Sequence, residues 1–162
     1  MDIYADNAAT TRLSRKALEA MMPYFTDHFG NPSSMHRFGQ TAAQALQRSR
    51  ETVARCVGAD PKEIYFTSGG SEADNQAILT AAAAAENTGK RHIVVSVIEH
   101  HAVLKAADAL RSRGFAVTLL PVSGDGFVSI RDAEDAVRED TALVSVMLGN
   151  NEVGTIQPIA AL

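Results

Sequence analysis

Apolar and polar positions follow two different spacings along this chain. Short apolar runs predict strands, and longer stretches with apolar residues three and four positions apart predict helices. The two kinds of element alternate in the second part of the chain. The expected strands are 64–67, 92–97, 115–120 and 143–147, and the helices between them are 71–87, 100–113 and 130–139. This alternation indicates βαβ units, so we expect an α/β fold with a mostly parallel sheet and flanking helices.

Two further helices are expected before the first strand, at 14–26 and 37–57. The second should end at Gly58, because glycine followed shortly by proline, here Pro61, is a typical helix stop. The segment 30–34, GNPSS, separates the two helices and consists of residues that favour turns. Such a loop suggests a functional role.

Paired glycines stand between the first predicted strand and the helix that follows it, in the segment 65–75. A strand, a glycine turn and a helix start leave free backbone N–H groups at the positive end of the helix dipole, which suits a phosphate group. The hydroxyls of Ser68 and Ser71 lie there too, and Ser71 with Asp74 fits a capping box. An ordinary capped turn with nothing bound explains the same residues equally well.

Ligands of parallel sheets lie beyond the carboxyl ends of the strands, and polar residues follow two more predicted strands there. They are Glu99, His100 and His101 after one strand, and Asn150 and Asn151 after another. Adjacent histidines at a helix start project ~100° apart, which disfavours a shared metal ion, so we expect no metal site. A histidine ring can instead stack on a flat cofactor, and the amides can fix a small ligand or simply a tight turn.

Composition narrows the functional classes. The 162 residues carry a net charge of −4 with acidic and basic residues interspersed, which argues against a nucleic-acid surface. We expect no membrane segment, since no apolar run reaches the length of a span. Cys56 is the one cysteine; we expect it to be a buried structural residue in a reducing, cytoplasmic environment.

Five motifs together resemble the cysteine desulfurases, which are pyridoxal-phosphate enzymes of the class V aminotransferase group. They are 4–11 (YADNAATT), 30–36 (GNPSSMH), 66–75 (FTSGGSEADN), 99–104 (EHHAVL) and 150–158 (NNEVGTIQP). Their order and spacing match from end to end. The resemblance implies an incomplete large domain of a fold-type I pyridoxal-phosphate enzyme, with three αβα layers over 14–162 after an N-terminal arm, 1–13.

The resemblance also implies a role for each matching position. Gly70 and Ser71 would bind the phosphate of the cofactor. His100 would stack on its pyridine ring and take part in proton transfer, and Asn151 would donate to its phenolic oxygen. Asn31 would lie in the loop on the substrate side.

The complete enzyme of this kind would convert L-cysteine to L-alanine and transfer the sulfur to an enzyme persulfide, as a homodimer that can serve a sulfur-acceptor protein. No segment here matches the family's Schiff-base lysine, pyridinium aspartate or persulfide cysteine. We therefore interpret the chain as the N-terminal portion, inactive alone, whose strand 64–67 lacks its neighbours. A related selenocysteine lyase, or a non-catalytic half-domain that pairs with a partner, remains the alternative.

Overall fold

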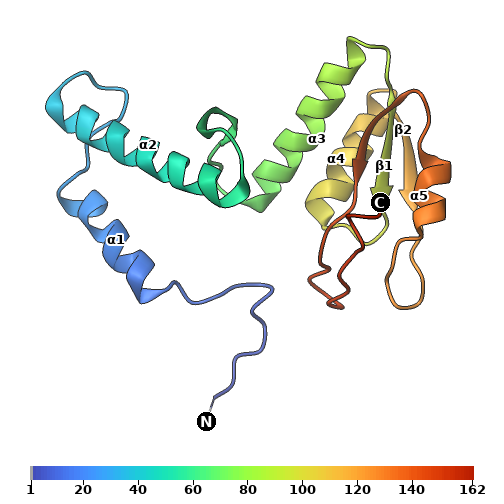
Figure 1. The fold of residues 1–162 in the computed structure, drawn as a ribbon, viewed down its shortest axis with the longest axis horizontal. Helices are drawn as coiled ribbons and strands as arrows, with labels where there is room; N and C mark the ends of the chain where they lie inside the picture. Colours follow the sequence, from blue (N-terminus) through green and yellow to red (C-terminus); the bar gives the residue numbers. More distant parts are fainter. Residues whose placement is uncertain (1) are drawn as a thin grey trace. The chain divides into compact units, whose positions relative to one another are not determined.

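The computed structural model describes residues 2–162, which form two compact units. The N-terminal unit is Met1–Phe66 and the C-terminal unit is Thr67–Leu162. Figure 1 follows the chain through both. The division expected from the sequence, an arm at 1–13 and a domain at 14–162, stays a prediction.

The N-terminal unit is helical. Helix α1 (Arg15–Thr26) begins where the Ser14 side chain accepts a hydrogen bond from the N–H of Ala17 at 3.1 Å. Helix α2 (Arg37–Val57) ends at Gly58, whose φ of 71° is the left-handed conformation that glycine adopts without a steric penalty. The short 3-10 helix η1 (Pro61–Glu63) follows. Both long helices lie where the sequence pattern predicts them.

The loop between α1 and α2 lies close against the start of α2. A Cβ atom on Gly30 would sit 2.2 Å from the backbone oxygen of Phe38, and one on Gly39 would sit 2.2 Å from that of Ser34. Only glycine allows this approach, because no real Cβ atom fits at such distances. The loop therefore has a defined conformation.

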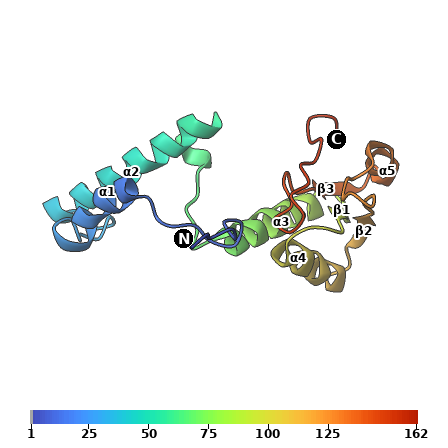
Figure 2. The same cartoon turned by 90° about the horizontal axis from the view of Figure 1, so that it is seen from below.

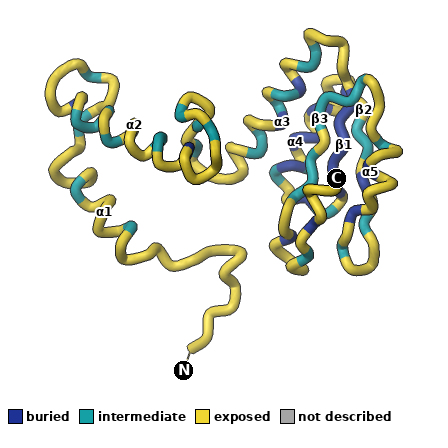
Figure 3. The backbone as a smooth tube through the Cα atoms, viewed as in Figure 1, coloured by how far each residue is buried: buried dark blue, intermediate teal, exposed yellow. Residues whose placement is uncertain are grey.

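The C-terminal unit contains α3 (Gly70–Glu86), β1 (His92–Ser96), α4 (His101–Ser112), β2 (Ala116–Leu120), α5 (Ile130–Ala136) and β3 (Thr141–Ser145). The strands form one parallel sheet in the order β2-β1-β3. The central strand β1 is buried along its whole length (Figure 3). Such burial on both faces is usual for a parallel strand and explains the consecutive apolar residues 93–95.

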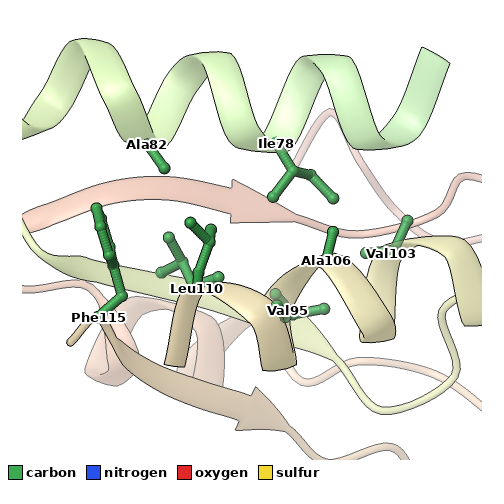
Figure 4. Packing of buried hydrophobic residues seen from close by; sticks show 9 residues of the cluster. Ile78, Ala82, Val95, Val103, Ala106, Leu110 and Phe115 are labelled. Carbon is green, nitrogen blue, oxygen red and sulfur yellow. The ribbon is translucent and has the colours of Figure 1, made fainter. Parts of the chain in front are cut away.

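Helices cover both faces of the sheet. On one face, α3 and α4 pack against β1 through a buried cluster that includes Ile78, Ala82, Ala106, Leu110 and Val95 (Figure 4). On the other face, Val94 packs with Leu120, Val128 and Ala133 of α5. Figure 2 shows the sheet from a second direction, with α5 away from α3 and α4. The α/β fold, the parallel sheet and the three layers are confirmed.

Three local expectations are wrong. Residues 64–67 form no strand: Ile64 has extended backbone angles, but the segment pairs with no strand among residues 2–162, and Tyr65 is 71% exposed. An apolar run needs a neighbouring strand to satisfy its backbone groups, and none is present there. Helix α5 ends at Ala136 rather than near residue 139. Cys56 is exposed rather than buried.

No helix within residues 2–162 has both the length and the hydropathy of a membrane span.

Candidate functional site

The carboxyl ends of β1 and β3 lie at one edge of the sheet, since these strands are parallel neighbours. Helices α3 and α4 also begin at this edge. In Figure 4, Ile78 lies near Ala106 and Ala82 lies toward Leu110, so the two helices run in the same direction, opposite to the strands. Three chain segments therefore meet here: the N-terminus of α3, the loop after β1, and the loop after β3.

The N-terminus of α3 is open. Gly69 is its N-cap and supplies no side-chain hydrogen bond, and the next two residues, Gly70 and Ser71, belong to the first turn, whose N–H groups have no acceptor within a helix. A Cβ atom on Gly69 or Gly70 would meet nothing within 4 Å. A ligand can thus approach these N–H groups closely, and the helix dipole favours an anionic one.

The start of α3 lacks the capping box that the sequence predicts. Ser71 lies inside the helix and does not cap it. Instead the carboxylate of Glu72 accepts hydrogen bonds from the N–H of Ser68 at 2.7 Å and from its hydroxyl at 2.5 Å. The hydroxyl bond, followed by the N–H bond, lowers the pKa of Glu72 below its usual 4.5. Ser68 is therefore engaged within the chain, and the Ser71 hydroxyl is not needed for capping.

His100 is the N-cap of α4. Its Nδ1 accepts a hydrogen bond from the N–H of Ala102 at 3.1 Å, so the neutral ring carries its proton on Nε2. The side chain is exposed, and the centroid of its ring lies 6.3 Å from that of His101. This cap bond orients the imidazole and leaves its face and Nε2 accessible for a ligand.

The two adjacent asparagines after β3 have different environments. Asn150 is buried, and its Oδ1 accepts hydrogen bonds from the N–H groups of Glu152 at 2.8 Å and Val153 at 2.9 Å. Asn151 is exposed, and its Nδ2 lies 3.3 Å from the Glu152 carboxylate. Asn150 thus shapes the turn, while the Asn151 amide is available to a ligand.

Sequence reasoning missed the structural role of Glu99. Its side chain is buried at the end of β1, where Oε1 accepts hydrogen bonds from the Ser96 hydroxyl at 2.9 Å and from the N–H of Met147 at 2.5 Å. The signal available in the sequence was a carboxylate directly after the mostly apolar run 93–98. The Met147 contact requires β3 beside β1, which the sequence pattern does not specify.

Asn31 lies in the N-terminal unit, whereas Gly70, Ser71, His100 and Asn151 lie at one edge of the C-terminal unit. The Oδ1 atom of Asn31 accepts a hydrogen bond from the N–H of Ser33 at 2.9 Å, which forms an Asx turn. Its Nδ2 group makes no recorded bond among the described residues. The other four positions lie on the three segments at this edge of the sheet, and Asn31 has a local role in its loop.

One cavity lies on a different surface of the C-terminal unit. It has a volume of about 540 Å³ and is lined by Ala133, Glu134, Val137, Val144, Val146, Ile159 and Leu162. This cavity faces the α5 side of the sheet and includes none of the candidate residues. Its lining is mostly aliphatic, without the converging polar groups of a small-molecule site. Nor do residues 2–162 contain three His, Cys, Asp or Glu side chains grouped as metal ligands.

Comparison with known proteins gives consistent matches along the chain. A cysteine desulfurase IscS from Methanosarcina thermophila is 50% identical over 157 residues, which are 97% of this chain but 39% of that protein. The solved structure of a NifS-like protein superposes with a TM-score of 0.94 at 43% identity, covering 98% of this chain and 43% of the other. A structure described as SspA in complex with cysteine gives a TM-score of 0.88 at 39% identity, covering 98% and 45%.

This chain therefore spans about two fifths of the length of the relatives that it matches. The family model described as Aminotransferase class-V matches residues 3–162, which is nearly every residue. With this match and the common fold, the chain belongs to the aminotransferase class-V family.

Proposed function

We propose that this chain is the N-terminal, cofactor-binding portion of a pyridoxal-phosphate-dependent cysteine desulfurase. The observation that carries the proposal is the edge at the carboxyl ends of β1 and β3. There an uncapped helix N-terminus, an oriented and exposed imidazole, and an exposed amide come from three separate segments. The relatives named cysteine desulfurase, and the cysteine complex of the related SspA, support the substrate L-cysteine.

The residues at this edge fit pyridoxal phosphate. The N–H groups of Gly70 and Ser71, with the Ser71 hydroxyl, would hold the phosphate at the positive end of α3. The open space over Gly70 admits the group without a clash. When bound, the cofactor supplies an electron sink for the carbanion chemistry of amino acids.

His100 and Asn151 would act on the ring of the cofactor. The exposed face of the His100 imidazole would stack on the pyridine ring, and its Nε2 would hold or transfer a proton, since Nδ1 is occupied by the Ala102 N–H. The Nδ2 group of Asn151 would donate a hydrogen bond to the phenolic oxygen. Asn31 belongs to the loop proposed to lie on the substrate side.

The lysine that would anchor the cofactor is not proposed from these residues. Lys90 donates to the carbonyl oxygen of Thr141 at 3.2 Å, at the opposite edge of the sheet, and Lys16, Lys62 and Lys105 lie outside the three loops. We infer that residues 1–162 alone do not release alanine from cysteine. A homodimer, a sulfur-acceptor protein and a cytoplasmic location belong to the same proposal.

The test uses the longer protein that carries this sequence. Purified protein should bind pyridoxal phosphate and release alanine from L-cysteine. Ser71→Ala should weaken cofactor binding about tenfold, the effect of one lost charge-assisted hydrogen bond. His100→Ala should lower kcat about a hundredfold or more, as loss of a general acid or base does.

Ser112→Ala, at an exposed serine, is the matched control for Ser71→Ala. His101→Ala, at the exposed histidine next to His100, is the control for His100→Ala. Both should keep the wild-type affinity and rate. Absence of cofactor binding to the wild-type protein would refute the proposal. Turnover of selenocysteine in strong preference to cysteine would replace the proposed substrate.

A further inference from the structure

Two hydrogen bonds join the loop that carries His100 to the loop that carries Asn151. Glu99 Oε1 accepts from the N–H of Met147 at 2.5 Å, and Asn150 Nδ2 donates to the carbonyl oxygen of Ile98 at 3.0 Å. In both bonds the loop after β3 donates and the loop after β1 accepts, and each loop contributes one side chain and one backbone group. We call this pair of contacts the Glu99–Asn150 clasp.

Both side chains of the clasp are buried, although they belong to loops. Glu99 is 8% exposed and Asn150 is 9% exposed. The Glu99 rotamer is held by the Ser96 hydroxyl, which donates to the same Oε1 atom, and Asn150 Oδ1 is held by two N–H groups of its own turn. Each residue is therefore fixed within its own loop and then reaches across to the other.

The Glu99 side chain is buried without a cationic partner among the described residues. No lysine, arginine or histidine in the described part of the chain forms an ion pair with it. A buried carboxylate without a cation is a costly way to gain stability. Its hydrogen bonds, however, define the distance between two strand ends more narrowly than apolar packing does, since they are directional.

The candidate ligand-binding residues follow the clasp residues directly. His100 is the next residue after Glu99, and its ring is oriented by the N–H of Ala102. Asn151 is the next residue after Asn150. A shift of either clasp residue thus displaces a cofactor-contacting side chain through a single peptide unit, with little flexible chain to absorb it.

We propose that Glu99 and Asn150 are positioning residues that set the spacing of His100 and Asn151 around the cofactor ring. The inference rests on the proposed function, because it concerns the same site. Neither clasp side chain needs to contact the cofactor. They would hold the two loops at the separation that allows His100 to stack on the ring and Asn151 to hydrogen-bond to it.

The test compares conservative variants in the longer protein. Glu99→Gln keeps the length of the side chain and an oxygen that can accept both bonds, whereas Glu99→Asp keeps the charge but shortens the reach to Met147. The positioning role predicts that Glu99→Gln retains cofactor affinity and kcat and that Glu99→Asp does not. Asn150→Ala removes the second contact. Matched controls are Glu139→Gln and Asn87→Ala, which change exposed residues that make no recorded side-chain hydrogen bond.

Glu99→Asp and Asn150→Ala should each weaken pyridoxal phosphate binding about tenfold and lower kcat about a hundredfold, as misplacement of about 1 Å does in an active site. KM for cysteine should change less than kcat. Glu99→Gln should stay within about threefold of wild type in both. In cofactor-free protein, amide hydrogen exchange at Met147 should speed up in Glu99→Asp and remain slow in Glu99→Gln.

A purely structural role gives a different result. If Glu99→Asp and Asn150→Ala lower the melting temperature but leave cofactor affinity and kcat at wild-type values, the positioning inference is wrong while the proposed function stands. The positioning inference is also wrong if Glu99→Gln and Glu99→Asp lower kcat equally, since the reach of the side chain to Met147 would then not matter. If the wild-type protein binds no cofactor, the proposed function fails, and the inference fails with it.

Discussion

The Nδ1 atom of the His92 imidazole lies 2.8 Å from the hydroxyl oxygen of Thr141. On its other side, Nε2 lies 2.8 Å from the hydroxyl of Thr118, so one side chain of β1 contacts both neighbouring strands. The backbone N–H of Arg138 donates to Thr141 Oγ1 at 2.7 Å. Each hydroxyl can donate or accept, so the two threonines satisfy both ring nitrogens of the neutral imidazole.

This arrangement makes the stability of the sheet depend on pH. Burial, and secondarily the charge of Arg138, lower the pKa of His92 below its usual 6.5. The unfolded chain therefore takes up a proton more readily than the folded chain. The contribution of neutral His92 to the free energy of unfolding is fully present above pH 6.5. It is lost as the pH falls toward the lower pKa of His92 in the folded chain.

Urea unfolding at pH 7.5 and at pH 5.5 measures this effect. The free energy of unfolding should be lower at pH 5.5, and His92→Gln should reduce the difference, because glutamine does not titrate. His101→Gln, at an exposed histidine, should keep the pH dependence of wild type. An equal slope in wild type and His92→Gln would contradict the assignment.

Leu110 of α4 has no exposed surface and packs in the apolar cluster between α4, α3 and the sheet. Leu110→Ala should cost about 2–5 kcal/mol of unfolding free energy, through lost burial and the cavity it leaves. Leu119→Ala, at a half-exposed position of β2, should cost markedly less. Chemical denaturation of the two variants side by side decides the point; similar losses would mean that α4 is not packed as described.

Gly39 allows the loop 30–34 to contact the start of α2. Gly39→Ala would place a Cβ atom 2.2 Å from the backbone oxygen of Ser34, and a backbone neighbour can move away only by distorting the loop. We expect a loss of about 1–3 kcal/mol, typical of overpacking. The readout is limited proteolysis within 30–34, which should become faster. Gly124→Ala, with nothing within 4 Å of the new atom, is the control and should leave the cleavage rate unchanged.

A negative charge at Ser71 should have opposite effects on folding and on binding. Ser71→Asp places a carboxylate in the first turn of α3, where the helix dipole stabilises it by about 0.3–1 kcal/mol. The same charge repels a phosphate group, so pyridoxal phosphate binding should be abolished. Ser112→Asp, at the last residue of α4, should instead destabilise the fold slightly and leave binding intact. Thermal melts and cofactor titration give both quantities; unchanged affinity in Ser71→Asp would place the phosphate elsewhere.

Local signals in the sequence predicted the helices well. Helix α2 runs over the expected residues because its stop, Gly58 in a left-handed conformation, is a property of the chain at that point. The start of α3 was less accurate. Ser71 with Asp74 has the spacing of a capping box, but Ser71 lies inside the helix, and the side-chain hydrogen bonds near the helix start join Ser68 to Glu72 instead. Competing local hydrogen bonds of similar strength cannot be ranked from spacing alone.

The sequence by itself determined the alternation of strands and helices, and with it the expectation that His100 and Asn151 follow strand ends. These features depend on side-chain periodicity and short-range turns. Only the tertiary structure decided that β3 lies beside β1, which brings Met147 to Glu99 and Ile98 to Asn150 across separations of 48 and 52 residues. It also decided that 64–67 is not a strand. The physical reason is the same in both cases: strand pairing and burial depend on which distant segment lies alongside, and a single stretch of sequence does not contain that information.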